Sequence, residues 1–286
     1  MTAKEIQDKV DSVLKEQFLQ YDVEKAPDIE NNPDFRLTHG NIGFAGEFTF
    51  LYVDMRGSST YTDQYRLQTI TKIYKAYHHC MVECITHFNG KVRSFDGDRV
   101  LAVFDGHRKA DDAISCAMTM VGCKFEILKP KIKTYFRNDD FSLGVGIATG
   151  SVMVSKAGVG YDKNNRDLIW IGDAANLGAK LSDEANTPNS IYICETTFRK
   201  LHRENKSPII DGKEINLWTK DKFDFKRSKL IFTKQFIIVN YKEKPAHNTR
   251  SYVHWLADVH SGSFAPAFTL SFHDSECSRK PPMHIA

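Results

Sequence analysis

The chain has 286 residues, 41% of them hydrophobic, which suits one large or two small domains with an ordinary buried core. Lys and Arg number 39 against 36 Asp and Glu, a net charge of +3, so the composition does not indicate a nucleic-acid-binding protein. No apolar run reaches the roughly twenty residues that span a bilayer, and the charged N-terminus lacks a signal-peptide core, so we expect a cytoplasmic protein with no membrane partner.

The cysteines predict neither a zinc site nor a disulfide framework. They contain no CxxC pair, and the chain is not a short secreted one. We therefore expect reduced thiols at all six positions, which are Cys80, Cys84, Cys116, Cys123, Cys194 and Cys277.

The N-terminal segment, residues 1–44, is predicted to be a helix followed by a linker. Apolar residues recur at helical spacing between positions 3 and 20, and the polar stretch DIENNPDFRLTHGNIG then breaks the pattern. The next run, FTFLYVDM at 48–55, is rich in β-favouring side chains and predicts a strand that ends at Arg56-Gly57.

A long amphipathic helix is expected over 63–88, where apolar residues recur every three or four positions until Asn89-Gly90. The strands KVRSF and RVLAVF then flank Asp96-Gly97-Asp98, a pattern typical of a β-hairpin with Asp98 at its tip. A second helix is predicted over about 108–128.

The remaining pattern favours strands with one more helix. FSLGVGIATG, SVMVSKAG and DLIWIG are predicted strands, DAANLGAKLSDEA a helix, and IYIC (191–194) and FIIVNY (236–241) the last two strands. This order predicts an α+β fold with a ferredoxin-like βαββαβ core, a mainly antiparallel sheet with helices packed on it. Residues 245–286 have little periodicity apart from 252–256, and we expect an irregular tail.

Two acidic residues are the strongest candidates for a functional site. Asp54 ends one predicted strand and Asp98 lies at the hairpin tip that this fold order brings beside it. Two carboxylates at that distance suit Mg²⁺ or Mn²⁺, which in turn bind triphosphate oxygens. Taken singly, Asp54 could cap the next helix and Asp98 could simply belong to its turn.

Four segments resemble, in order and spacing, the signatures of class III adenylate and guanylate cyclases: FLYVDMRGSST, KVRSFDGDRVLAVF, LGVGIATGSVMVSKAG and DLIWIGDAANLGAKL. The resemblance covers about residues 46–242 and implies a cyclase domain over 45–244. It implies that Asp54, Asp98 and the backbone carbonyl of Met55 hold two divalent metals, Mn²⁺ or Mg²⁺. The substrate would be a nucleoside triphosphate, whose ribose Asn176 would contact and whose phosphates the backbone at Gly97 would approach. The enzyme would be a homodimer with its sites in the interface.

The purine-recognition positions of that family depart from its pattern. Adenylate cyclases have Lys and Asp or Thr where this chain has Ser94 and Ile169, and guanylate cyclases have Glu and Cys. Tyr52 and Arg56 lie two residues before and two residues after Asp54, so in a strand all three side chains are on the same face. Tyr52 and Arg56 could therefore contact a base or the triphosphate. With YVDMRGS, the chain resembles the pyrimidine cyclases of bacterial Pycsar antiphage systems. That resemblance implies cyclic UMP or cyclic CMP as the product and a separate effector protein as its receptor. It does not distinguish UTP from CTP as the substrate.

One departure concerns the phosphate chemistry. Lys180 stands where the family has a transition-state arginine four residues after Asn176, so a bidentate phosphate contact is lost there. Either Lys180 supplies the charge, or Arg56, Arg99 or Arg166 does. An atypical adenylate cyclase and a catalytically silent sensor domain remain alternatives.

Three further side chains are expected to pack and not to bind ligands. His78 and His79 lie in the long helix without a partner at metal-ligand spacing, and Trp170 lies in a predicted strand.

Overall fold

The computed structural model describes residues 4–11, 22–25, 42–136, 141–158, 166–185, 188–210, 213–225, 228–234, 237–238, 251–257 and 264–271. The chain divides into two compact units, Met1–Phe236 and Ile237–Ala286. Residues 4–11 form a helix, as predicted, while the rest of the expected N-terminal helix and most of the linker lie outside the described residues.

The first unit is built on one mixed sheet, in the order β10-β11-β7-β5-β2-β4-β3, with β1 beside β2 and β6 beside β5. Neighbouring strands are antiparallel except for the parallel pairs β5–β7 and β1–β2. The strands are β1 (Asp22–Lys25), β2 (Ile42–Arg56), β3 (Lys91–Asp96), β4 (Arg99–Phe104), β5 (Ser142–Gly158), β6 (Arg166–Ile171), β7 (Ser190–Cys194), β10 (Thr219–Phe225) and β11 (Ser228–Lys234). A separate short pair is β8 (Ile209–Ile210) with β9 (Lys213–Glu214).

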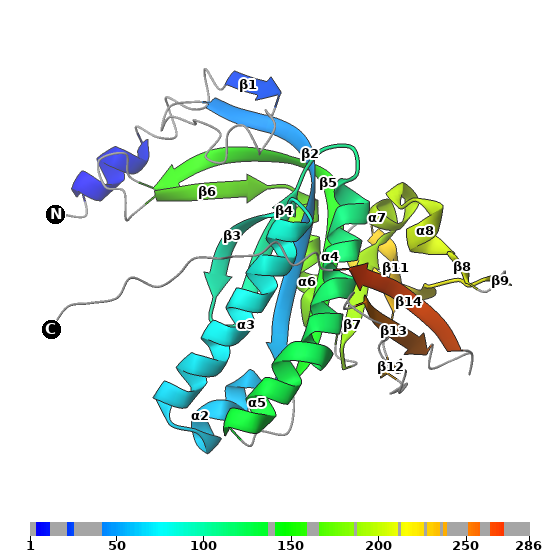
Figure 1. Cartoon of the computed structure of the whole chain (residues 1–286). Coiled ribbons are helices and arrows are strands. Elements are labelled where there is room, and N and C mark those ends of the chain that lie inside the picture. The colour runs from blue at the N-terminus through cyan, green and yellow to red at the C-terminus, as the bar shows by residue number, and fades with distance from the viewer. Residues whose placement is uncertain are drawn as a thin grey trace, which may run out of the picture. The chain divides into compact units, whose positions relative to one another are not determined.

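Helices cover both faces of this sheet. In Figure 1, α3 and α4 lie side by side in front of it and α6 lies behind it. The helical elements are η1 (Ser58–Thr60), α2 (Tyr61–Gln64), α3 (Leu67–His87), α4 (Lys109–Cys123), the π-helical η2 (Lys124–Leu128), α5 (Lys129–Phe136), α6 (Asp173–Glu184), α7 (Glu195–Lys200) and α8 (Arg203–Lys206). None of the helices in the described ranges combines the length and apolar character that a bilayer crossing requires.

The sheet and its helices confirm the predicted ferredoxin-like core. The elements β2, α3, β3, β4, α4 and β5 follow the βαββαβ order, and their strands lie in the order β5-β2-β4-β3. The strand β4 therefore lies between β2 and β3, which flank α3 in the sequence. This insertion places the β3–β4 hairpin directly beside β2.

The glycine-punctuated stretch 141–158 differs from the prediction. Two strands were expected there, but β5 is continuous and pairs with β2 from Ser142 to Val154. Gly146 marks a close approach of α6 and not a break: a Cβ there would lie 2.1 Å from the Ser182 nitrogen and 2.2 Å from the Gly178 oxygen. The glycine thus lets the helix backbone lie against the strand.

FIIVNY was predicted to be one of the last two strands; its described part is a strand, but β13 and β14 follow it. Its described part, β12 (Ile237–Ile238), pairs with β13 in the second unit, whereas β11 pairs with β7 in the first. The segment SKLIFTK that forms β11 has only three consecutive apolar residues between two lysines, so its strand character was overlooked beside the more apolar run that follows.

The expected irregular tail over 245–286 also contains regular structure. Strands β13 (Ser251–Ala257) and β14 (Phe264–Ser271) pair in antiparallel fashion, with β12 at the other edge of β13. The sequence of β13, SYVHWLA, combines aromatic and β-branched residues that favour strands. Prolines and histidines in the surrounding segment obscured this pattern.

The face of the sheet under α6 carries an aromatic core. Phe48 and Phe50 of β2 pack with Val152, Val154 and the α6 alanines. The Trp170 ring meets both phenylalanine rings edge to face, with centroids 5.5 Å apart in each case. Trp170 is therefore a packing residue, as predicted.

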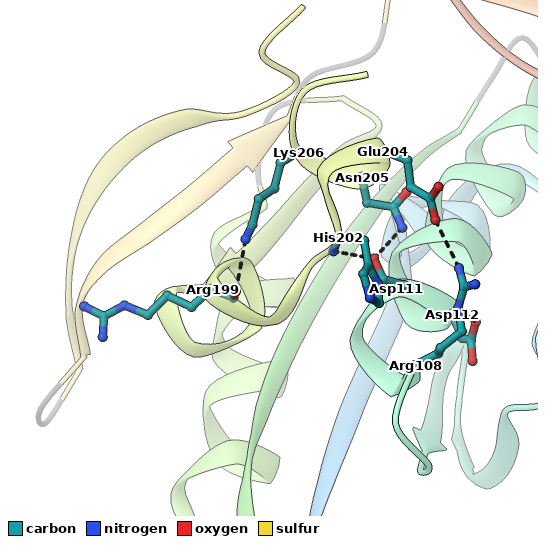
Figure 2. A network of polar contacts seen from close by, with 8 residues as sticks. All are labelled: Arg108, Asp111, Asp112, Arg199, His202, Glu204, Asn205 and Lys206. Atoms are coloured by element: carbon teal, nitrogen blue, oxygen red, sulfur yellow. Dashed lines mark hydrogen bonds and ion pairs between the residues drawn. The ribbon is translucent and has the colours of Figure 1, made fainter. Parts of the chain in front are cut away.

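A buried carboxylate ties α4 to the segment after α7. Asp111 is 1% exposed and accepts hydrogen bonds from the His202 backbone N–H at 3.0 Å and the Asn205 amide at 2.8 Å (Figure 2). The carbonyl of Asn205 in turn accepts from the Trp218 indole at 2.7 Å. This network fixes three segments that are distant in the sequence.

We expect Asp111→Ala to lower the free energy of unfolding by about 2–3 kcal/mol, because the buried Asn205 amide loses its charged acceptor. Urea denaturation measures this loss. The matched control is Asp112→Ala, which removes the neighbouring, partly exposed carboxylate that lies 4.0 Å from Arg108 and should change stability by less than about 1 kcal/mol. Equal losses in the two variants would contradict a special role for the buried network.

Candidate active site

Strand pairing brings Asp54 and Asp98 to one end of β2. The β2–β4 ladder runs to Val53 opposite Val100, so the Gly97-Asp98 turn lies beside the following residues of β2. The Met55 backbone N–H donates to Asp98 Oδ2 at 3.2 Å. Gly97 adopts a φ of +60°, which glycine tolerates without strain and which closes this two-residue turn.

Asp54 lies in a compact group of opposite charges. Its Oδ2 is 3.4 Å from Arg56 Nη1 and 3.7 Å from Arg99 Nη2. Burial raises the pKa of the Asp54 carboxyl, the negative charge of Asp98 raises it further, and the two arginines oppose this shift. The described contacts of Asp54 are thus with charged side chains and not with a helix N-terminus.

This donor set fits a divalent cation. Two carboxylates repel each other at the end of a buried strand, which is the condition that a bound cation relieves. Asp54 keeps 15% of its side chain exposed, so an ion has access from solvent. Among the described residues, the carboxylates of Asp54 and Asp98 are suitable oxygen ligands for such an ion.

The Arg56 side chain lies over the neighbouring strand β5, at Gly144. Gly144 pairs with Asp54 in the β2–β5 ladder, and a Cβ at Gly144 would come within 2.4–2.7 Å of three atoms of the Arg56 guanidinium group. The Nε and Nη2 atoms of Arg56 are buried and have no hydrogen-bond partner among the described residues. A glycine at 144 is thus what allows Arg56 to reach Asp54.

Arg99 connects the carboxylate pair to α6. Besides Asp54 it binds Asp183, near the C-terminal end of α6, through a short ion pair. Asp183 was not identified from the sequence. Asp183 lies seven residues, or two helical turns, after Asn176 in the sequence. That spacing is the feature by which the sequence could have identified Asp183.

Tyr52 lies on the same face of β2 as Asp54 and packs against α6. A Cβ at Gly178 would lie 3.1 Å from the Tyr52 ring. Burial raises the pKa of the Tyr52 hydroxyl, with the charge of Arg99 opposing the shift, so the hydroxyl stays protonated at neutral pH. It can both donate and accept a hydrogen bond.

The other candidate residues whose side chains the structure describes are exposed in one protomer. Ser94 is exposed on β3, and Asn176 and Lys180 are exposed on α6. Ile169 on β6 is 41% exposed and pairs with Ser155, eleven residues beyond Gly144 on β5 and so roughly 35 Å along the strand. The side chain of Arg166 lies outside the described residues.

His78 has a packing role, as predicted, and it packs against the hairpin that carries Asp98. Its ring lies 5.1 Å from the Phe95 ring on β3. The helix α3 thus supports the hairpin that carries Asp98. His79 is exposed and lies 3.9 Å from Glu83.

Known proteins resemble the chain in both sequence and fold. No protein-family model matches it. It is 36% identical over 189 residues to a uridylate cyclase of Xanthomonas perforans, covering 65% of this chain and 78% of that protein. It is 30% identical over 207 residues to a uridylate cyclase of Burkholderia cepacia, covering 72% and 86% of the two chains.

The fold is similar to that of solved cyclases. The adenylyl cyclase CyaB from P. aeruginosa superposes with a TM-score of 0.57 at 18% identity, over 71% of this chain and 99% of that one. With the sequence relatives, this shows that the chain belongs to the class III nucleotidyl cyclases. The family expected from the four sequence segments is confirmed.

We expect Gly144→Ala to displace Arg56 from Asp54, because the added methyl group occupies the place of the guanidinium group. Catalytic activity on a nucleoside triphosphate should fall at least about tenfold while the circular dichroism spectrum is kept, since a lost charge contact costs about 1.5–3 kcal/mol. Gly150→Ala on the same strand is the control, because its new Cβ meets only the Ala174 methyl group at 3.0 Å. Equal loss in both variants would indicate general damage to β5.

Proposed function

We propose that the chain is a pyrimidine nucleotidyl cyclase that converts UTP to cyclic UMP and pyrophosphate. The observation that carries the proposal is the convergence of Asp54 and Asp98 at the end of β2, beside Tyr52. Absence of both purine codes at Ser94 and Ile169 supports a pyrimidine base. The names of the two relatives favour uracil over cytosine.

In this reaction the ribose 3′-hydroxyl attacks the α-phosphorus and pyrophosphate leaves. When bound by Asp54, Asp98 and the Met55 carbonyl, two divalent ions, Mn²⁺ or Mg²⁺, neutralise the triphosphate and favour the alkoxide form of the hydroxyl. The chain's own contribution is to hold the two carboxylates at a fixed separation, through the Met55 N–H to Asp98 bond and the His78 contact with the hairpin. Positioning and charge stabilisation supply most of the rate in such reactions.

Base recognition is assigned to Tyr52. Its protonated hydroxyl donates to uracil O4, and the same group accepts from cytosine N4. Tyr52 is held by α6 on one side and lies two residues from the metal-binding Asp54, so a base contacting it and a triphosphate contacting Asp54 belong to one substrate.

The product assay tests this function. Purified protein with Mn²⁺ and each of the four ribonucleoside triphosphates should give cyclic UMP as the main product by mass spectrometry, and Asp54→Asn and Asp98→Asn should give none. Tyr52→Phe should raise KM for UTP about tenfold, because one hydrogen bond of about 1.4 kcal/mol is lost. Cyclic AMP as the main product would replace the proposal by an atypical adenylate cyclase, and no product with any triphosphate would favour a silent sensor domain.

We assign the transition-state charge to Arg99. It lies 3.7 Å from Asp54, whereas Lys180 is exposed on α6 of the same protomer. Arg99→Ala should lower kcat by about 100-fold with a smaller change in KM, since a charge that acts in the transition state affects kcat. Lys180→Ala is the matched control and should change kcat by less than about threefold. The reverse pattern would return the role to Lys180, from either protomer.

A homodimer would complete the site. Asn176 on α6 and Ile169 and Ile171 on β6 (41% and 54%) are exposed in one protomer, which supports their meeting the carboxylates of the partner. Asp54→Asn and Asn176→Ala should each be inactive alone. Mixed after exchange of subunits, they should regain about a quarter of wild-type activity, because half the dimers then hold one intact site of two.

No regain, with exchange confirmed by light scattering and differential tags, would contradict shared sites.

We further propose that the cyclic nucleotide acts on a separate effector protein in defence against phage. Cyclic UMP should rise in infected cells with the wild-type chain and not with Asp54→Asn, and an unchanged level in both would contradict this role.

A further inference from the structure

Three cysteines converge where α3 meets α4. Cys80 and Cys84 are four residues apart on α3 and so lie on one helix face, and Cys123 is the last residue of α4. Their three Sγ atoms all lie within 4.8 Å of one another, and the Sγ atoms of Cys84 and Cys123 are 3.9 Å apart. No local sequence pattern signals this cluster, because Cys123 is 39 residues from Cys84.

We propose that Cys80, Cys84 and Cys123 form a three-thiolate site for a soft metal ion, Zn²⁺ or Cu⁺. Thiolates bound to one zinc at about 2.3 Å with tetrahedral angles lie about 3.8 Å apart, close to the Cys84–Cys123 separation. Soft sulfur ligands select Cu⁺ and Zn²⁺ over Mg²⁺ and Mn²⁺, which prefer oxygen. The site is thus chemically distinct from the carboxylate pair at Asp54 and Asp98.

The surroundings suit an ion that enters from one side. Cys84 and Cys123 are 5% and 7% exposed, whereas Cys80 is half-buried and gives access from solvent. Three thiolates satisfy Cu⁺ in a trigonal arrangement, and a water at the Cys80 side can supply the fourth ligand of Zn²⁺. No carboxylate or imidazole joins the cluster within the part of the chain that the structure describes.

The helix itself changes geometry at this point. The π-helical turn Lys124–Leu128 begins directly after Cys123. Such turns are rare and occur frequently at functional sites, because the extra residue re-aims the side chains next to it.

Simple packing and a disulfide bond both fit the three cysteines less well than a metal ion does. Cys116 shows how a buried cysteine packs alone in the same helix, since it is fully buried and outside the cluster. A Cys84–Cys123 disulfide would leave the third thiol unused.

A bound ion would cross-link α3 to α4 behind the hairpin. His78, two residues before Cys80, contacts Phe95 of that hairpin, so the ion would stiffen the support of Asp98. Binding of the ion does not depend on the proposed reaction. Metal content and cyclase activity can therefore fail independently.

The test uses the full chain with Asp54→Asn and Asp98→Asn, which removes the carboxylate site. The reduced, metal-free protein is titrated with Zn²⁺, and anaerobically with Cu⁺, each against a chromophoric chelator. We expect one equivalent of at least one of these ions, three thiols protected from an aromatic disulfide, and a raised Tm. X-ray absorption should show three sulfur ligands.

Cys84→Ala and Cys123→Ala should each weaken binding at least about 100-fold, since one of three ligands is lost. Cys116→Ala is the matched control and should bind as the parent does. If a buried variant fails to fold by circular dichroism, Cys80→Ser at the half-buried position carries the test. The proposal is wrong if neither ion competes with the chelator, or if binding survives when all three cysteines are replaced.

Discussion

The antiparallel pairing of β2 with β4 is the interaction on which the site depends. It sets the register in which Val53 lies opposite Val100, and that register alone puts the tip of the β3–β4 hairpin beside Asp54. A shift of one residue would turn Asp54 to the other face of the sheet, because side chains alternate along a strand. The Met55 N–H to Asp98 bond then fixes the second carboxylate from the backbone of the first strand.

Around this pair the fold balances like charges with fixed cations. Asp54 and Asp98 repel each other where burial already disfavours a charged carboxylate, and Arg56 and Arg99 oppose both effects. Two glycines make this possible. Gly144 leaves room for the Arg56 guanidinium group, and Gly146 lets α6 approach closely enough for Asp183 to bind Arg99.

The two faces of the sheet have separate tasks. The α6 face carries the aromatic core and Tyr52, and it presents Asn176 and Lys180 outward. The opposite layer, α3 with α4, supports the hairpin through His78 and contains the cysteine cluster. The layer that supports the hairpin carrying Asp98 thus has its own group of potential metal ligands with a different preference, sulfur in place of oxygen.

The sequence by itself determined the α+β class, the βαββαβ order and the carboxylate pair, because strand and helix periodicities and a two-residue turn are local properties. It also led to the family through four ordered segments. It failed where pairing depended on residues distant in the sequence: the glycines of β5 looked like breaks, FIIVNY looked like one of the last two strands, and residues 245–286 looked irregular.

Only the tertiary structure decided which side chains meet. Asp183 reaches Arg99 across 84 residues of sequence, and Cys123 reaches Cys84 across 39. Neither contact leaves a local pattern, since helix–sheet and helix–helix packing bring together residues whose spacing in the chain is arbitrary. The sequence thus determined the elements and the pair of carboxylates, and packing determined the charge balance around Asp54 and Asp98 and the thiol cluster behind their hairpin.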